Sequence, residues 1–233
     1  MNCIFLRRGY GDIGGGGLSN SFADTDWSNI ILACQNNTVP DTWRVKDQKP
    51  MTINGVDYYI DIIGKNHDTY TSGGKAPLTF QLHDCYGTTY GMNSSDTNSG
   101  GWRDCAMRNT HLPAILNLMP GNVKTAIKAV NKSTALTTGS TTQTTTSDKL
   151  FLLSEWEIFA QTNWSTVEEG VQYEYYASGG NTIKNVNGTA SQWWARSVRG
   201  GGSSNQFTGA NATGATTSIR ASRTMGVSFA FCF

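Results

Sequence analysis

The sequence predicts an α+β domain of short antiparallel strands, two or three short helices and long loops. Charged residues make up only 15% of the 233-residue chain, against about 25% in ordinary soluble domains. The chain contains 26 glycines and 7 tryptophans, and its apolar residues fall in short runs, several of them alternating. Aromatic residues at 11% supply a core, which excludes a disordered protein. No apolar run approaches the roughly 18 residues of a membrane span, so no membrane insertion is expected.

Two regions are expected along the chain: a glycine-rich N-terminal arm over residues 1–21 and one domain over residues 22–233. The domain is expected to begin with an amphipathic helix over 22–34, capped by Asp24 or Thr25. The apolar face of this helix consists of Trp27, Ile30, Ile31 and Cys34. No signal peptide is visible, because the N-terminus lacks an apolar stretch of the required length.

A hairpin is expected over residues 51–63, where Asn54-Gly55 supplies two residues that tolerate positive φ, as a type I′ turn requires. Alternation of apolar and polar residues predicts a strand over 78–82. The other elements of the first half are a polar loop over 93–101 and helices over 112–118 and 123–130.

The second half is expected to combine buried strands with long polar segments. Ser154 and Glu157 match a capping box that opens a short helix. Strands are expected over 149–153, 172–176 and 193–197, and a half-buried closing strand over 227–233. The threonine-rich segment 134–147 predicts an extended loop or an irregular exposed ribbon. Residues 198–226 predict a long polar segment without regular structure, a kind that is commonly functional.

No catalytic or metal-binding constellation is visible. The three histidines are far apart, the glycine run has no phosphate-loop lysine after it, and no acidic residues have calcium-loop spacing. Glu155 and Glu157 are interpreted as solvated surface carboxylates. The five cysteines contain no C-x-x-C pair and are expected to be mostly small buried hydrophobes. These observations predict a binding or structural protein, not an enzyme, with no cofactor and no metal.

Charge is unevenly distributed along the chain. No acidic residue follows Glu174, whereas the remaining tail contains five dispersed basic residues. Their dispersal argues against nucleic-acid binding, which uses clustered basic patches. A surface formed by this tail is therefore expected to be neutral to basic.

Several segments in order resemble one known family. They are residues 100–102, 107–108, 115–120, 148–157, 172–176, 193–197 and 226–229. Together they resemble a phage-associated domain family with a C-type-lectin-like fold, which is related to the formylglycine-generating-enzyme architecture. Members occur in phage structural and tail proteins and among the variable proteins of diversity-generating retroelements. The resemblance covers roughly residues 22–233 and implies a C-type-lectin-like fold for this domain.

In such variable proteins the C-terminal segment is diversified by adenine-directed mutagenesis, and residues 198–225 have the composition that this process produces. The resemblance implies that the following positions are diversified and bind the ligand: Arg199, Ser203, Ser204, Asn205, Gln206, Thr208, Thr216, Thr217, Ser218, Ile219, Arg220, Arg223 and Thr224. The positions that resemble the fixed framework are Phe207, Asn211, Gly214, Ala221, Ser222, Gly226 and Val227. Trp193, Trp194, Phe229 and Phe231 are expected to provide burial, and Arg196 to be a structural hydrogen-bonding residue.

The resemblance implies a ligand-binding protein that displays this segment to a protein or glycan ligand on a cell surface. It implies a location in a virion or phage tail, or alternatively at a cell surface, with a homo-oligomer or other phage structural proteins as further partners. The alternative is a non-diversified structural phage protein. A formylglycine-generating type of enzyme is a further alternative, but Cys232 stands without a nearby partner cysteine, a departure that argues against oxidase activity. Calcium is not expected, because no Glu-Pro-Asn or Trp-Asn-Asp signature is present.

Overall fold

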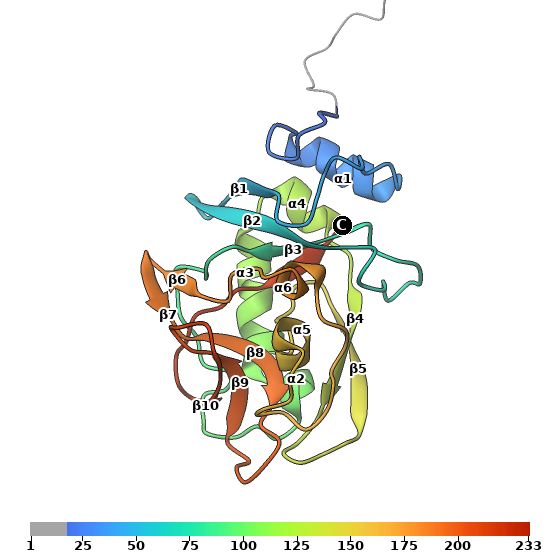
Figure 1. Cartoon of the computed structure of the whole chain (residues 1–233). Helices are drawn as coiled ribbons and strands as arrows, with labels where there is room; N and C mark the ends of the chain where they lie inside the picture. The colour runs from blue at the N-terminus through green and yellow to red at the C-terminus, as the bar shows by residue number, and fades with distance from the viewer. Residues whose placement is uncertain (1–17) are drawn as a thin grey trace, which may run out of the picture.

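The computed structural model describes residues 18–233 (Figure 1), so residues 1–17 of the expected N-terminal arm lie outside the described part of the chain. The helices are α1 (Trp27–Gln35), α2 (Gly101–Asp104), the π-helical turn η1 (Met107–His111), α3 (Leu112–Leu118), α4 (Gly121–Ala126), α5 (Glu155–Phe159) and α6 (Glu174–Ala177). The first strands are β1 (Gln48–Ile53), β2 (Val56–Lys65), β3 (Leu78–Leu82), β4 (Val130–Ala135) and β5 (Gln143–Asp148). The later strands are β6 (Lys184–Val186), β7 (Thr189–Ser191), β8 (Trp193–Val198), β9 (Gln206–Ala210), β10 (Thr216–Arg220) and β11 (Ala230–Cys232).

The central antiparallel sheet has the strand order β1-β2-β3-β11. Its β1–β2 hairpin turns at Asn54 and Gly55, both at positive φ, which confirms the hairpin prediction. The last strand, β11, pairs with β3 so that Phe231 lies opposite Phe80, and their rings stack with centroids 5.4 Å apart. The C-terminus of the chain is therefore part of the core.

A second sheet has the order β10-β9-β8, and β4–β5 and β6–β7 form two-stranded hairpins. In Figure 1 the β8–β10 sheet and the β4–β5 hairpin lie on either side of α2, α3 and α5. The mixed helical and antiparallel content confirms an α+β architecture. Within residues 18–233 no helix is long and apolar enough to span a bilayer.

Aromatic residues provide most of the largest side chains in the core, as the composition predicts. Trp193, Trp194, Phe229 and Phe231 are all completely buried, and a large aromatic side chain hides about 150–250 Å². Cys34, Cys85, Cys105 and Cys232 are buried free thiols, which confirms their expected role as small core residues.

Three expectations for the middle of the chain are wrong. The threonine-rich segment forms most of the β4–β5 hairpin instead of an irregular ribbon, because β-branched threonines alternate with Thr134 and Thr146 facing inward. The helix expected over 123–130 ends at Ala126, and Val130 already opens β4. The strand expected over 172–176 is replaced by α6, which buries two adjacent tyrosines.

The ends of the domain also differ from expectation. The first helix begins only at Trp27, with Asp26 as an N-cap that makes no side-chain capping bond, while Thr25 Oγ1 donates to Ser21 O at 2.8 Å. Residues 149–153 contribute only an isolated bridge from Phe151 to Ala230. The closing strand is short and buried on both faces, because it lies at the centre of the core and not on its surface.

A tight backbone contact at the start of α2 gives the first prediction. Gly101 has φ +57°, and a Cβ there would lie 2.2 Å from Ala135 O. Gly101→Ala is therefore expected to destabilise the domain by about 1–3 kcal/mol, through strain and displacement of β4. Urea unfolding followed by circular dichroism measures the loss. Gly121→Ala, where a Cβ meets nothing within 4 Å, is the control, and an equal loss in both variants would refute the steric explanation.

Candidate functional site

The segment expected to be structureless forms the β9–β10 hairpin. Phe207 of β9 pairs with Ile219 of β10, and both are buried. The turn between the strands is closed by Asn211, whose Oδ1 accepts hydrogen bonds from Thr213 N at 2.9 Å and Ala215 N at 3.0 Å. Gly214 follows at φ +81°. The prediction of a structureless loop is therefore wrong, because these paired apolar residues and the turn from Asn211 to Gly214 order the segment.

The candidate ligand-binding positions fall into three groups by exposure. The exposed positions are Ser204, Arg220, Arg223 and Thr224. Half-buried positions are Arg199, Ser203, Asn205, Gln206, Thr216, Thr217 and Ser218. Thr208 and Ile219 are buried, so their expected exposure is wrong: Thr208 lies on the central strand of the sheet, and Ile219 packs inward beside Phe207. We call the exposed and half-buried positions together the C-terminal surface.

Three half-buried members of this surface form a polar network. Gln206 Oε1 accepts hydrogen bonds from Arg199 Nη1 and from Ser218 Oγ, the latter at 3.0 Å. The Arg199 guanidinium also lies over the Trp164 ring, 5.1 Å from its centroid, at a distance typical of a cation–π contact. Trp164, which sequence reasoning did not single out, therefore belongs beside the C-terminal surface.

Asn98 anchors the loop before β9 from beneath. Its backbone N donates to Ser204 O at 2.8 Å, and its Nδ2 donates to Gln206 O at 2.8 Å. Asn98 is completely buried, so these bonds are shielded from water. The sequence placed Asn98 only in a polar loop, because no local pattern shows a partner more than 100 positions away.

Acidic side chains from earlier in the chain reach the C-terminal surface. Asp96 accepts hydrogen bonds from Ser222 Oγ at 2.6 Å and Ser222 N at 3.1 Å, and Arg220 Nη1 lies 3.5 Å away. The hydrogen bonds from Ser222 lower the pKa of Asp96 below its ordinary value. The neutral-to-basic surface was expected from the residues after Glu174 alone. The surface also contains the carboxylate of Asp96, so that expectation is incomplete.

Glu155 lies under the same surface and is completely buried, so its interpretation as a solvated carboxylate is wrong. It accepts hydrogen bonds from Thr216 Oγ1 at 2.6 Å and from Ser165 N at 2.7 Å. The adjoining loop packs closely on the surface segment, because a Cβ on Gly200 would lie 2.5 Å from Thr166 Oγ1. Glu155 thus joins three segments at the base of the C-terminal surface.

Glu157 is also buried rather than solvated, and it pairs with Arg196 and, at 2.8 Å, with Lys132. The capping box at Ser154 is confirmed. Arg196 further donates to Leu152 O at 3.0 Å and Ser133 O at 3.0 Å, which confirms its expected structural role. Burial would raise the pKa of Glu157, but the two cations outweigh it and lower that pKa.

This ion network continues to Asp68. Lys132 Nζ lies 2.8 Å from Asp68 Oδ1 and 2.9 Å from Tyr173 Oη. Burial opposes ionisation of Asp68, yet the adjacent Lys132 ammonium lowers the pKa of Asp68 to about 2. Cys232 Sγ lies 3.5 Å from Thr79 Oγ1, and burial raises the pKa of its thiol well above the ordinary value. A protonated thiol is a weak nucleophile.

The three histidines lie in separate places, as the sequence suggested. His67 stacks on Tyr173, His111 stacks on Tyr90, and His83 Nδ1 lies 2.8 Å from Asp61 Oδ2. In the part of the chain that the structure describes, no group of three or more His, Cys, Asp or Glu side chains is arranged to hold a metal ion.

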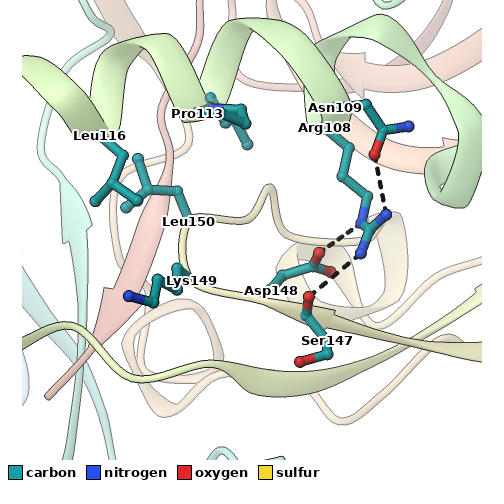
Figure 2. Close-up of a pocket in the computed structure, with 9 residues that line it drawn as sticks. Arg108, Asn109, Pro113, Leu116, Ser147, Asp148, Lys149 and Leu150 are labelled. Atoms are coloured by element: carbon teal, nitrogen blue, oxygen red, sulfur yellow. Dashed lines mark hydrogen bonds and ion pairs between the residues drawn. The ribbon is translucent and has the colours of Figure 1, made fainter.

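A cleft that the sequence did not indicate lies between α3 and the end of β5 (Figure 2). It has a volume of about 290 Å³. Its lining residues are Arg108, Asn109, Leu112, Pro113, Leu116, Ser147, Asp148, Lys149 and Leu150. We call this feature the α3–β5 cleft.

Comparison with known proteins yields one family. The family described as "Domain of unknown function (DUF6273)" matches residues 79–233, which is more than half of the chain. The matched region contains the C-terminal surface, most of the buried ion network and the α3–β5 cleft. No curated protein and no solved structure matches the chain.

Proposed function

We propose a ligand-binding function for this chain, which belongs to the DUF6273 family. In this proposal the C-terminal surface contacts a protein or glycan on a cell surface. The observation that supports it most is that residues 198–225 combine buried apolar side chains with exposed polar ones. Apolar residues of this segment, such as Phe207 and Ala221, are buried, whereas its residues Arg220, Arg223 and Thr224 are exposed.

This division suits a surface that changes without unfolding the domain. Substitutions of exposed residues usually alter stability by no more than about 0.5 kcal/mol, so the outer positions are free to vary. Asn98, Glu155 and the Trp164 loop support the surface from segments outside it. In this proposal these supporting residues are not diversified.

We extend the proposal to a C-type-lectin-like fold and to diversification of the C-terminal surface in a phage-associated protein. The ordered motifs named above support this extension, as does the polar composition of the exposed positions. The neighbouring genome tests it: a reverse-transcriptase gene with a near-copy of the coding sequence for residues 193–233 is expected. A locus of phage structural genes lacking both would favour the non-diversified structural protein.

Binding through the C-terminal surface predicts that charge reversal there weakens recognition strongly without unfolding the protein. The purified full chain is screened on an array of glycans and on whole bacterial cells, and Arg223→Glu is then tested on whatever the wild type binds. Arg223 is exposed, and its side chain makes no hydrogen bond or ion pair within residues 18–233. We therefore expect a binding loss of about tenfold or more and a nearly unchanged melting temperature.

The matched control is Arg44→Glu, which reverses the charge of another exposed arginine, in the segment between α1 and β1. It is expected to retain binding. Equal loss in both variants would show that net charge, not the C-terminal surface, governs recognition. Unfolding by Arg223→Glu would contradict the exposed position of that residue.

Assembly through the N-terminal arm is the competing function, and it has a separate test. Deleting residues 1–17 removes most of the arm and keeps α1 together with Ser19, whose carbonyl accepts a hydrogen bond from the buried Trp43 Nε1 at 3.1 Å. If the chain is primarily an assembly protein, size-exclusion chromatography with light scattering should show an oligomer that dissociates on truncation. An unchanged mass with retained ligand binding would favour the recognition function.

A further inference from the structure

One wall of the α3–β5 cleft is apolar. Leu112, Pro113 and Leu116 come from α3, and Leu150 comes from the segment that follows β5. Figure 2 shows Leu116 and Leu150 side by side at one end, with Pro113 above the middle of the cleft. Leu116 is only half-buried, so part of its surface remains accessible to a ligand.

The opposite end of the cleft is polar and rigidly held. Arg108 Nε donates to Asp148 Oδ1 at 2.5 Å, and Arg108 Nη2 donates to Ser147 O at 3.2 Å (Figure 2). Asp148 is itself buried and accepts hydrogen bonds from Trp102 Nε1 at 2.9 Å and Thr146 Oγ1 at 2.5 Å. Through Asp148 the Arg108 guanidinium is fixed to the core.

Arg108 retains one unused donor. Its Nη1 donates to Arg103 O at 3.0 Å and to Asn109 Oδ1 at 3.1 Å. A guanidinium has five N–H groups, and the contacts to Asp148, Ser147, Arg103 and Asn109 occupy four of them. The fifth, on Nη2, has no partner among the residues described.

Lys149 adds a second cation at the rim, at the end of the cleft where Leu116 and Leu150 lie (Figure 2). It is exposed, and its ammonium has no ion-pair or hydrogen-bond partner in residues 18–233. Arg108 and Lys149 are positive and Asp148 is negative, so the lining has an excess of one positive charge. A ligand for this cleft should therefore be an anion.

The backbone next to the cleft is unusual as well. Arg108 and Asn109 belong to η1, a π-helical turn directly before α3. Such turns are rare, insert an extra residue into a helix and occur frequently at functional sites. Here the wider turn carries the polar side chains of the cleft, while the regular α3 carries the apolar ones.

We propose that the α3–β5 cleft binds a small carboxylate that has a short apolar chain. The carboxylate accepts from the free N–H of Arg108, and the chain packs against Pro113 and Leu116, the apolar lining residues that keep accessible surface. A volume of about 290 Å³ is close to the lower limit of small-molecule pockets, about 300 Å³. The site is separate from the C-terminal surface, so it is independent of the proposed recognition function.

The test uses hexanoate as the probe and the ¹⁵N-labelled full chain. Saturable amide shifts are expected near Asn109, Leu116 and Lys149. Hexanamide keeps the chain without the charge, and hexylamine reverses the charge, so both should bind more weakly than hexanoate. Equal shifts with hexanamide would overturn the anion site, and the absence of saturation with hexanoate would overturn the site altogether.

Two variants connect any binding to the cleft without disturbing the Arg108–Asp148 pair. Lys149→Gln removes the excess positive charge of the lining and should weaken hexanoate binding by about threefold, which is the scale of one exposed charge. Leu116→Ser should weaken it by about tenfold through lost apolar burial. The controls are Lys124→Gln on α4 and Leu118→Ser, whose side chain lies outside the cleft lining. Binding that is equally affected by variants and controls would refute the assignment.

Discussion

Replacement of Arg196 by alanine is expected to lower the free energy of unfolding by about 3–5 kcal/mol, the cost of breaking a buried ion pair from one side. Arg196 is completely buried and pairs with Glu157. Without it, Lys132 is the one cationic partner that Glu157 keeps among residues 18–233, and the carbonyls of Leu152 and Ser133 lose a donor. Urea unfolding followed by tryptophan fluorescence measures the effect.

An exposed pair provides the matched control for this variant. Arg103 lies 2.6 Å from Asp104, with both side chains about half exposed, and Arg103→Ala should cost no more than about 1 kcal/mol. Arg196→Lys keeps the charge but loses the planar fork, so it should fall between the two. Equal losses for Arg196→Ala and Arg103→Ala would show that the buried network contributes no more than a surface pair.

Acid is expected to remove about 2 kcal/mol of stability through Asp68 alone. The pKa of Asp68 is about 2 in the folded protein, against an ordinary value of 3.8, and each pKa unit corresponds to about 1.4 kcal/mol. Because the unfolded chain binds this proton more tightly, the contribution is complete above pH 3.8 and is lost as the pH falls toward 2. The lowered pKa of Glu157 acts in the same direction.

Glu169 should act oppositely at higher pH. Its pKa is raised because burial outweighs the attraction of Arg196, so its protonation on acidification stabilises the fold before Asp68 begins to titrate. The free energy of unfolding, measured in urea from about pH 7 to about pH 2, should therefore fall most steeply below about pH 4. Asp68→Asn should flatten this acid limb. An unchanged slope in that variant would show that Asp68 is not the titrating group.

Elements that depend on residues close together in the sequence could be predicted. The Asn54-Gly55 hairpin, the Ser154–Glu157 capping box and the β8 strand at Trp193 are where local patterns put them. Elements in low-complexity segments could not. The threonine-rich β4–β5 hairpin and the β9–β10 hairpin form because each strand finds a partner, and pairing leaves little trace in a sequence of small polar residues.

The segment that forms the candidate site was predicted from the sequence, but the residues that hold this segment in place were not. Strand pairing exposes Arg220 and buries Ile219, although the two residues are neighbours. Asn98, Asp96 and Trp164 were missed because each belongs to a segment remote from residues 198–225. The α3–β5 cleft was missed for the same reason, since it exists only where a helix and a hairpin from different segments meet.

The low charge and many aromatic residues thus determined by themselves that this chain has a large aromatic core with short strands and helices. Local φ preferences and apolar periodicity act over a few residues, so the sequence alone shows them. Only the tertiary structure decided which polar groups are buried and which surface is presented. Glu157 is stable in the interior because Arg196, 39 positions further along the chain, is brought to it, and the energy of a buried charge depends on such a partner and not on its sequence neighbours.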